Sequence, residues 1–140
     1  MKADNCIFFQ LAKASQTAVK FMGQKISGLN VTPVQAMVIG FLAEEDQIMA
    51  GELGKKVELD SATLTGILDR LETAQLIERK GNPDDRRSVK IHLTTLGKET
   101  GFEVKKLIEE ANKEFLADFT ENEKQELHGF ILKLREKISR

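Results

Sequence analysis

Two adjacent arginines, Arg86 and Arg87, follow two aspartates in the segment GNPDDRRSVK, which spans residues 81–90. A guanidinium group stays charged, loses hydration easily and presents a planar set of donors, which suits it to phosphate contacts. A neighbouring carboxylate can hold such a group in one orientation, and we expect Asp85 to have that role. The segment therefore predicts a contact site for a polyanion.

Charge along the chain is segregated, although the net charge is only −1. Residues 79–90 hold five cations and two anions, a balance of +3, whereas residues 99–126 hold nine acids and four lysines, a balance of −5. Phosphate contact depends on the local field rather than on the total charge. We therefore expect the basic segment to face nucleic acid and the acidic segment to face away from it.

The basic segment is expected to form the tip and the returning strand of a β-hairpin, at about residues 76–93. Turn-forming residues at positions 81–83 separate two strand candidates, residues 76–80 and 89–93. In the second candidate, apolar and polar residues alternate, as in a strand with one buried face. Lys90 lies on the polar side, where we expect it to contact phosphate.

A helix-turn-helix is expected before this hairpin, at about residues 50–73. A short helix over residues 50–57 leads into a second helix, which Asp60 or Ser61 would cap. The second helix is expected to direct four apolar residues inward, namely Leu64, Ile67, Leu68 and Leu71. A hairpin added to a helix-turn-helix makes a winged helix, which would span residues 33–94.

The outer side of the second helix offers polar side chains for DNA contact in the major groove, while an arginine at the hairpin tip can enter the minor groove. The candidates on the helix are Ser61, Thr63, Thr65 and Arg70. For Arg70 an ion pair with Glu72 or with an aspartate of the hairpin is an equal alternative.

A long helix is expected near the N-terminus, from about Asp4 to Ser27, with Asp4 as its N-cap. The next helix is expected to begin with Thr32 as N-cap, followed by Pro33 and by Gln35, which completes a capping box. Its inward side is expected to consist of apolar residues, namely Val34, Met37, Val38, Phe41 and Leu42.

Two further long helices are expected within residues 95–138, the first beginning at about Thr94 or Thr95 and the second with a capping box of Thr120 and Glu123. Like the helix within residues 4–28, they carry apolar stripes that lie outside the compact winged helix. Such helices need another surface to cover them. We therefore expect these two regions to form a dimerisation surface.

The segment from Leu59 to Glu99 resembles the multiple-antibiotic-resistance-regulator (MarR) family of winged helix-turn-helix transcription factors. The family pattern is Asp-Arg-Leu-Glu at the end of the recognition helix, a Leu-Ile strand, an Asp-Arg-Arg wing and a Leu-Thr…Gly step into the next helix. The matching residues here are 69–72, 76–77, 85–87, and Leu93, Thr94 and Gly97. The resemblance extends over essentially the whole chain, so residues 1–140 are expected to form a single MarR-type domain.

This resemblance implies a mainly α (α+β) fold in which a winged helix-turn-helix is joined to N- and C-terminal dimerisation helices. It implies a homodimer that binds a palindromic operator in double-stranded DNA, usually as a repressor that a small-molecule effector or oxidation releases. The two recognition helices would lie about one DNA turn apart, roughly 34–36 Å. By family analogy Phe21, Met22, Met37 and Phe41 could line an effector pocket, although core packing is the favoured role for them.

Two residues depart from the family pattern. Gly66 occupies a recognition-helix position where the family often carries arginine, so a DNA contact is expected to be missing there. This departure favours the alternative function, a winged-helix protein–protein interaction module that does not bind DNA. Gln75 replaces the usual glycine after the recognition helix, which predicts some strain or an altered C-cap there.

Several other functions are disfavoured by the residues. The single cysteine, Cys6, lies in the apolar segment NCIFF of a chain without tyrosine, which favours a buried helix cysteine over a redox sensor. His92 and His128 are too far apart to predict a metal site, and no nucleophile–base pair or phosphate-binding glycine loop predicts an enzyme or a cofactor. The absence of a signal-peptide pattern and of a long apolar run predicts a cytoplasmic protein with no membrane partner.

Overall fold

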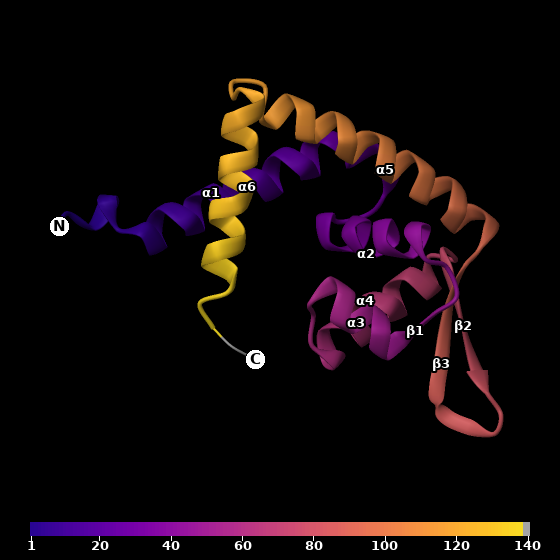
Figure 1. Ribbon diagram of the computed structural model, residues 1–140. Coiled ribbons are helices and arrows are strands. Elements are labelled where there is room, and N and C mark those ends of the chain that lie inside the picture. Colours follow the sequence, from indigo (N-terminus) through magenta and orange to yellow (C-terminus); the bar gives the residue numbers. More distant parts are fainter. Residues whose placement is uncertain (139–140) are drawn as a thin grey trace.

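The computed structural model of the protein describes residues 1–138, leaving aside the side chains of residues 82, 86 and 87. In chain order its main elements are α1 (Ile7–Lys25), α2 (Pro33–Glu44), β1 (Ile48–Met49), α3 (Ala50–Val57), α4 (Ser61–Thr73), β2 (Ile77–Asn82), β3 (Asp85–Leu93), α5 (Thr95–Phe115) and α6 (Glu121–Arg135). Figure 1 shows α2, α3 and α4 beside a small sheet, with α1, α5 and α6 extending away from them. The predicted mainly α winged-helix fold is confirmed.

The start of α1 differs from the prediction. Asp4 lies within a short 3₁₀ helix (Ala3–Asn5), and Cys6 occupies the N-cap position of α1 without a side-chain cap. The predicted Asp4 cap is wrong because the 3₁₀ turn directs the backbone carbonyl of Asp4, rather than its side chain, toward the helix, where it accepts a hydrogen bond from Gln10 Nε2 at 2.5 Å. Cys6 is half-buried at this helix start. The prediction of a buried cysteine inside a helix is therefore wrong.

The predicted capping box of α2 is confirmed. The backbone N–H of Gln35 donates to Thr32 Oγ1 at 3.2 Å, and the backbone N–H of Thr32 donates to Gln35 Oε1 at 3.1 Å. The predicted inward side is partly wrong, because Val34 and Met37 are 42% and 44% exposed. Nearly every position of this helix is apolar, so periodicity could not identify the buried side. The residues that it buries are Ala36, Val38, Ile39 and Leu42.

The helix-turn-helix agrees closely with the prediction. Helix α3 has the predicted bounds, and Asp60 rather than Ser61 caps α4. All four residues predicted to point inward from α4 are buried, namely Leu64, Ile67, Leu68 and Leu71. Between the two helices Glu58 adopts the left-handed conformation, with φ 55° and ψ 42°.

The sheet has the order β1-β3-β2 and is antiparallel throughout. Strand β1 was not predicted, since it is only two residues long, and its Ile48 pairs with Ile91 of β3. Strand β3 begins at Asp85, four residues before the predicted strand, so only Pro83 and Asp84 lie in the turn between the strands. Arg86 and Arg87 therefore belong to the first residues of a strand rather than to an extended loop.

The wing joins α5 through a tightly bonded junction. Thr94 caps α5 by accepting from the Gly97 N–H at 2.9 Å, and its own hydroxyl donates to the carbonyl of Gln75 at 2.7 Å. Gln75 has φ 63°, the left-handed conformation that glycine favours, so the predicted strain after α4 is confirmed at this residue. Gly97 packs directly against the backbone of Leu76, and a Cβ atom on it would lie 2.0 Å from the Leu76 carbonyl oxygen.

Helices α1 and α5 pack against each other. The rings of Phe21 and Phe115 have centroids 5.1 Å apart, and Lys25 Nζ lies 2.6 Å from Glu114 Oε1. No helix among residues 1–138 combines the length and apolar character needed to cross a bilayer.

Helix α6 begins with the predicted capping box of Thr120 and Glu123, which is confirmed. It buries none of its side chains within the chain, and Phe130 is 58% exposed. Exposed apolar side chains also cluster along α1. The larger ones on these two helices are Ile7, Phe8, Phe9, Leu11, Val19, Phe130, Ile131, Leu132 and Leu134.

Candidate nucleic-acid interface

The first turn of α4 is held by its N-cap. Asp60 accepts from the backbone N–H of Thr63 at 2.8 Å and from the Thr63 hydroxyl at 2.9 Å. These two bonds, the backbone bond first, lower the pKa of Asp60 below its ordinary value of 3.8, because they favour the charged carboxylate. The Asp60 carboxylate therefore remains ionised at neutral pH and fixes the start of α4.

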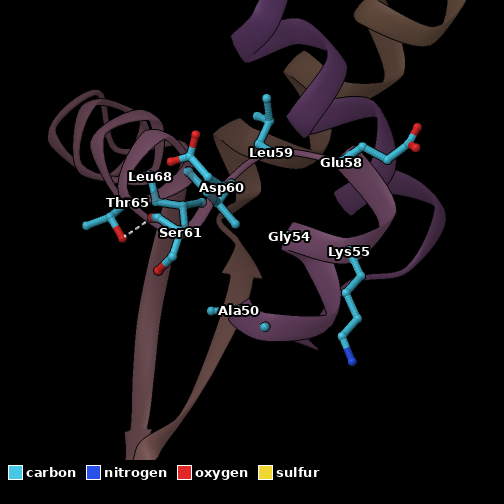
Figure 2. A pocket seen from close by; sticks show the side chains of 11 residues that line it. Ala50, Gly54, Lys55, Glu58, Leu59, Asp60, Ser61, Thr65 and Leu68 are labelled. Atoms are coloured by element: carbon cyan, nitrogen blue, oxygen red, sulfur yellow. Dashed lines mark hydrogen bonds between the residues drawn. The ribbon is translucent and has the colours of Figure 1, made fainter. Parts of the chain in front are cut away.

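The three predicted hydroxyl residues of α4 are not equivalent. The Thr65 hydroxyl donates to the backbone carbonyl of Ser61 at 2.8 Å, as Figure 2 shows, and the Thr63 hydroxyl donates to Asp60. The Ser61 hydroxyl makes no hydrogen bond to any residue that the structure describes. Of these three residues, Ser61 is therefore the one whose hydroxyl proton is not used by another described residue and is available for a phosphate oxygen.

A hollow of about 540 Å³ separates α3 from the start of α4. In Figure 2 the Lys55 amine and the Ser61 hydroxyl extend toward one side of it, whereas the carboxylates of Glu58 and Asp60 extend toward the other. One side of this hollow thus offers a cation and a free donor, and the acids point away from them.

The wing carries a second group of cations midway along its two strands. Lys80 of β2 and Lys90 of β3 are direct partners across the ladder, and both are exposed. Together with His92 they line a hollow of about 290 Å³. Like charges directly opposite each other repel, and an anion placed between them would relieve that repulsion.

Near the wing tip, Asp85 accepts a hydrogen bond from the Ser88 hydroxyl at 2.9 Å. Arg86 and Arg87 lie in β3, but their side chains fall outside the described part of the structure. The predicted orientation of an arginine by Asp85 therefore stays a prediction.

Arg79 links the wing to the recognition helix, a role that the sequence analysis did not assign. Its guanidinium Nη2 lies 2.5 Å from Asp69 Oδ1 and 2.9 Å from Glu72 Oε1, and its backbone N–H donates to Glu72 Oε2 at 3.2 Å. The side-chain bond from Arg79 lowers the pKa of Glu72, and the backbone bond adds to this effect. The sequence could have suggested this pair, because β2 begins only a few residues after the end of α4. The first residues of such a strand lie beside the last turn of the helix.

Arg70 is exposed and makes no ion pair within residues 1–138. Its predicted alternative partner, Glu72, is engaged by Arg79 instead. Arg70 thus remains available for a contact outside the chain. Gly66 lies on the same helix, and a Cβ atom built on it would meet no atom within 4 Å.

The four candidate pocket residues divide between two neighbouring hollows. Phe21 and Met22 line one of about 160 Å³ between α1 and α5, while Met37 and Phe41 line another of about 250 Å³ between α2 and α5. Ile108 of α5 lines both. The residues are therefore not brought into one pocket within the chain, although a single α5 side chain connects the two spaces.

Comparison with known proteins agrees with this architecture. The sequence pattern of the MarR family matches residues 31–89. The chain is 36% identical over 97 residues to the organic hydroperoxide resistance transcriptional regulator of Bacillus subtilis (strain 168), a match covering 69% of this chain and 66% of that protein. It is 30% identical over 125 residues to the HTH-type transcriptional regulator SarZ of Staphylococcus haemolyticus, which covers 88% of this chain and 82% of that one.

Among solved structures, a mutant of MarR from E. coli complexed with operator DNA superimposes with a TM-score of 0.85 and 26% identity, over 96% of this chain and 99% of that chain. A probable transcriptional regulator from Pseudomonas aeruginosa gives a TM-score of 0.87 and 28% identity, over 95% and 99%. The proteins of this group are regulators rather than enzymes. A capped recognition helix tied to a cationic wing, on a fold shared over nearly the full chain, thus shows that this protein belongs to the MarR family of DNA-binding transcriptional regulators.

Proposed function

We propose that the protein is a homodimeric repressor that binds a palindromic operator through two copies of α4 and the wing. One observation carries this proposal. Arg79 joins the capped helix α4, with its free Ser61 hydroxyl, to a hairpin in which two lysines face each other across the strands. This arrangement presents donors from two elements as a single surface. Contacts from two elements to the phosphates beside a groove would fix the register and orientation of the protein on the duplex.

The proposed dimer rests on the exposed apolar side chains of α1 and α6. Side chains such as Phe8, which is 79% exposed, gain several kcal/mol in total when a second copy covers them, at about 25 cal/mol per Å² of apolar area. Two-fold symmetry would then place the two α4 helices about one DNA turn apart, roughly 34–36 Å. A palindromic operator follows from that symmetry.

Within each half-site, we assign different roles to the side chains of α4. Ser61 donates to a phosphate, because its hydroxyl proton is free, and the N-terminus of α4 supports that contact. Thr63 and Thr65 use their protons within the helix, so they contact bases through their methyl groups, which suits thymine. Arg70 contacts the backbone or a base edge beyond them.

The wing supplies the remaining contacts in this proposal. Arg86 or Arg87 enters the minor groove, where the negative potential is focused, and Asp85 orients the arginine. Lys90, with Lys80 opposite, contacts the flanking phosphates. Because the function requires chromosomal DNA, we place the protein in the cytoplasm.

The release of DNA is proposed to depend on a small-molecule effector in the two hollows along α5. A molecule that occupied the hollow between α2 and α5, next to Met37 and Phe41, would contact the winged helix and the dimerisation region at once. A ligand can shift the balance between two arrangements only through such differential contacts.

The test is a fluorescence-anisotropy titration of the protein against a labelled duplex from upstream of its own gene, at several salt concentrations. Binding that weakens steeply with salt is expected, and Arg86→Ala with Arg87→Ala should weaken it at least tenfold while the dimer persists in sedimentation. The matched control, Lys106→Ala with Lys113→Ala, removes two exposed charges from α5 and should leave affinity nearly unchanged. If the wild-type protein shows no salt-dependent binding, the protein-interaction alternative replaces this proposal.

A further inference from the structure

Helix α6 makes one charged contact with the helix-turn-helix. The guanidinium of Arg135, the last residue of α6, forms an ion pair with the carboxylate of Glu58, which lies 77 positions earlier in the turn between α3 and α4. Among the described residues, no other ion pair connects α6 to the winged helix. In Figure 1 α6 begins beside the end of α5, far from the winged helix, and runs back to end on the side where α3 lies.

The backbone at Glu58 makes this contact informative. With φ 55° and ψ 42°, Glu58 adopts the left-handed conformation, which glycine and asparagine tolerate best and a glutamate side chain disfavours. The same position bounds the hollow lined by Lys55 and Ser61, where a carboxylate would repel a phosphate. Glutamate is therefore an unfavourable residue for the turn itself and for a nearby DNA backbone, and the ion pair with Arg135 offsets the charge of its carboxylate.

We infer that Arg135 and Glu58 form a positioning pair that sets the distance between the dimerisation helices and the winged helix. Arg135 neutralises the Glu58 carboxylate, keeps it directed away from the phosphate side of the hollow, and fixes the α3–α4 turn to the end of α6. In the proposed dimer, on which this inference rests, α6 belongs to the shared dimerisation region. A fixed distance from α6 to each turn thereby fixes the separation of the two α4 helices.

A purely stabilising role predicts a different outcome. Both side chains are about half exposed, 53% for Arg135 and 43% for Glu58, and ion pairs at such exposure contribute little to folding stability. Loss of the pair should hence leave the unfolding transition almost unchanged. The effect of losing the pair should appear in the binding of two half-sites, because such binding requires a defined separation of the two winged helices.

The test compares Glu58→Gln, Arg135→Gln and the charge exchange Glu58→Arg with Arg135→Glu, using Lys133→Gln as the matched control. Lys133 lies on the same helix, carries the same charge and makes no ion pair within residues 1–138. The probe is the duplex that wild-type protein selects from a random-sequence pool, together with versions that have one or two base pairs inserted between the half-sites. Affinity is measured by anisotropy, and the dimer by sedimentation.

Both single variants should bind the selected duplex about fivefold more weakly, the energy scale of a contacting charged pair, and should lose less affinity than wild type when a base pair is inserted. The direction in which Glu58→Gln changes the DNA affinity is decisive. If Glu58 acted only through its charge, removal of that charge near DNA would tighten binding. The charge exchange should restore most of the affinity and the spacing preference, while Lys133→Gln should change neither.

The inference is overturned if Glu58→Gln tightens binding, if Arg135→Gln behaves like Lys133→Gln, or if Arg135→Gln is monomeric, which would make its role one of assembly. These outcomes leave the proposed function intact as long as wild-type protein is a dimer that binds DNA. A wild-type protein that is monomeric or does not bind DNA would instead refute the proposed function, and the inference with it.

Discussion

Gly97 gives a sharp test of how the wing is joined to α5. In Gly97→Ala, the new Cβ atom would lie 2.0 Å from the carbonyl oxygen of Leu76 and 3.0 Å from its carbonyl carbon. Both are backbone atoms, so a side-chain rotation cannot relieve the overlap. The carbonyl oxygen of Leu76 also accepts from the Thr94 N–H at 3.1 Å, and any displacement of this carbonyl strains the cap of α5.

Overpacking in a core typically costs about 1–3 kcal/mol, and a fixed backbone obstacle places this substitution at the upper end, about 3 kcal/mol. For a domain of this size each kcal/mol lowers Tm by roughly 3 °C, so we expect a decrease of about 9 °C. The assay is thermal unfolding followed by circular dichroism at one fixed protein concentration, since a dimer's Tm depends on concentration.

Gly66→Ala is the matched control for Gly97→Ala. It also replaces a helical glycine, but the new Cβ atom would meet no atom within 4 Å. Alanine is favoured over glycine inside a helix by about 0.5–1 kcal/mol, so the Tm of Gly66→Ala should rise slightly. If Gly97→Ala melts within 2 °C or so of wild type, the contact with Leu76 does not restrict this position and the reasoning about the junction is wrong.

Three further predictions concern α4 and the wing. Arg79→Ala should destabilise the fold by about 1 kcal/mol, since both of its acidic partners are exposed, and should weaken DNA binding more than this because the wing loses its link to α4; urea unfolding and anisotropy measure the two effects. The pKa of Asp60 is lowered, so its cap contributes stability above the ordinary pKa of 3.8 and loses it as the pH falls through the lowered value; Asp60→Asn should reduce the loss of stability in acid, seen in urea titrations between pH 2 and 5. Lys90→Ala should reduce the slope of log affinity against log salt by about one, and an unchanged slope would exclude a phosphate contact there.

The sequence was most informative where local chemistry decides the structure. Thr32 with Gln35, and Thr120 with Glu123, are capping boxes whose two bonds form within four residues, and both helix starts were predicted correctly. The inward side of α4 was also predicted, because its apolar residues occupy one face only. In these cases the residues that determine the structure are neighbours in the chain.

The predictions failed where distant contacts decide. The buried side of α2 depends on which neighbours surround it, and a helix that is apolar on all sides does not indicate that choice. Strand β1 exists because β3 offers Ile91 as a partner to Ile48, and two residues are too few to show a strand period. Asp4 lost its predicted capping role to a 3₁₀ turn that no nearby residue signals.

The candidate site shows the same division. Residues of α4 and of the wing could be proposed individually from their types, but the ion pairs of Arg79 with Asp69 and Glu72 depend on the return of β2 along α4. This pairing also changes how the charge of the basic segment should be interpreted. Arg79 is offset by two acids of α4, so the cations left for DNA are those further along the hairpin.

These links bear on how an effector could release DNA. The two ends of α4 are fixed by different devices, the Asp60 cap at its start and Arg79 at its last turn, so the helix and the wing form one unit before DNA arrives. Prior ordering of this kind reduces the entropy that binding must offset. A ligand between α2 and α5 would therefore not loosen α4 alone, since α4 and the wing move together. In the proposed dimer it would instead change the separation of the two winged helices, and we expect the pair of Glu58 and Arg135 to be the contact that sets this separation.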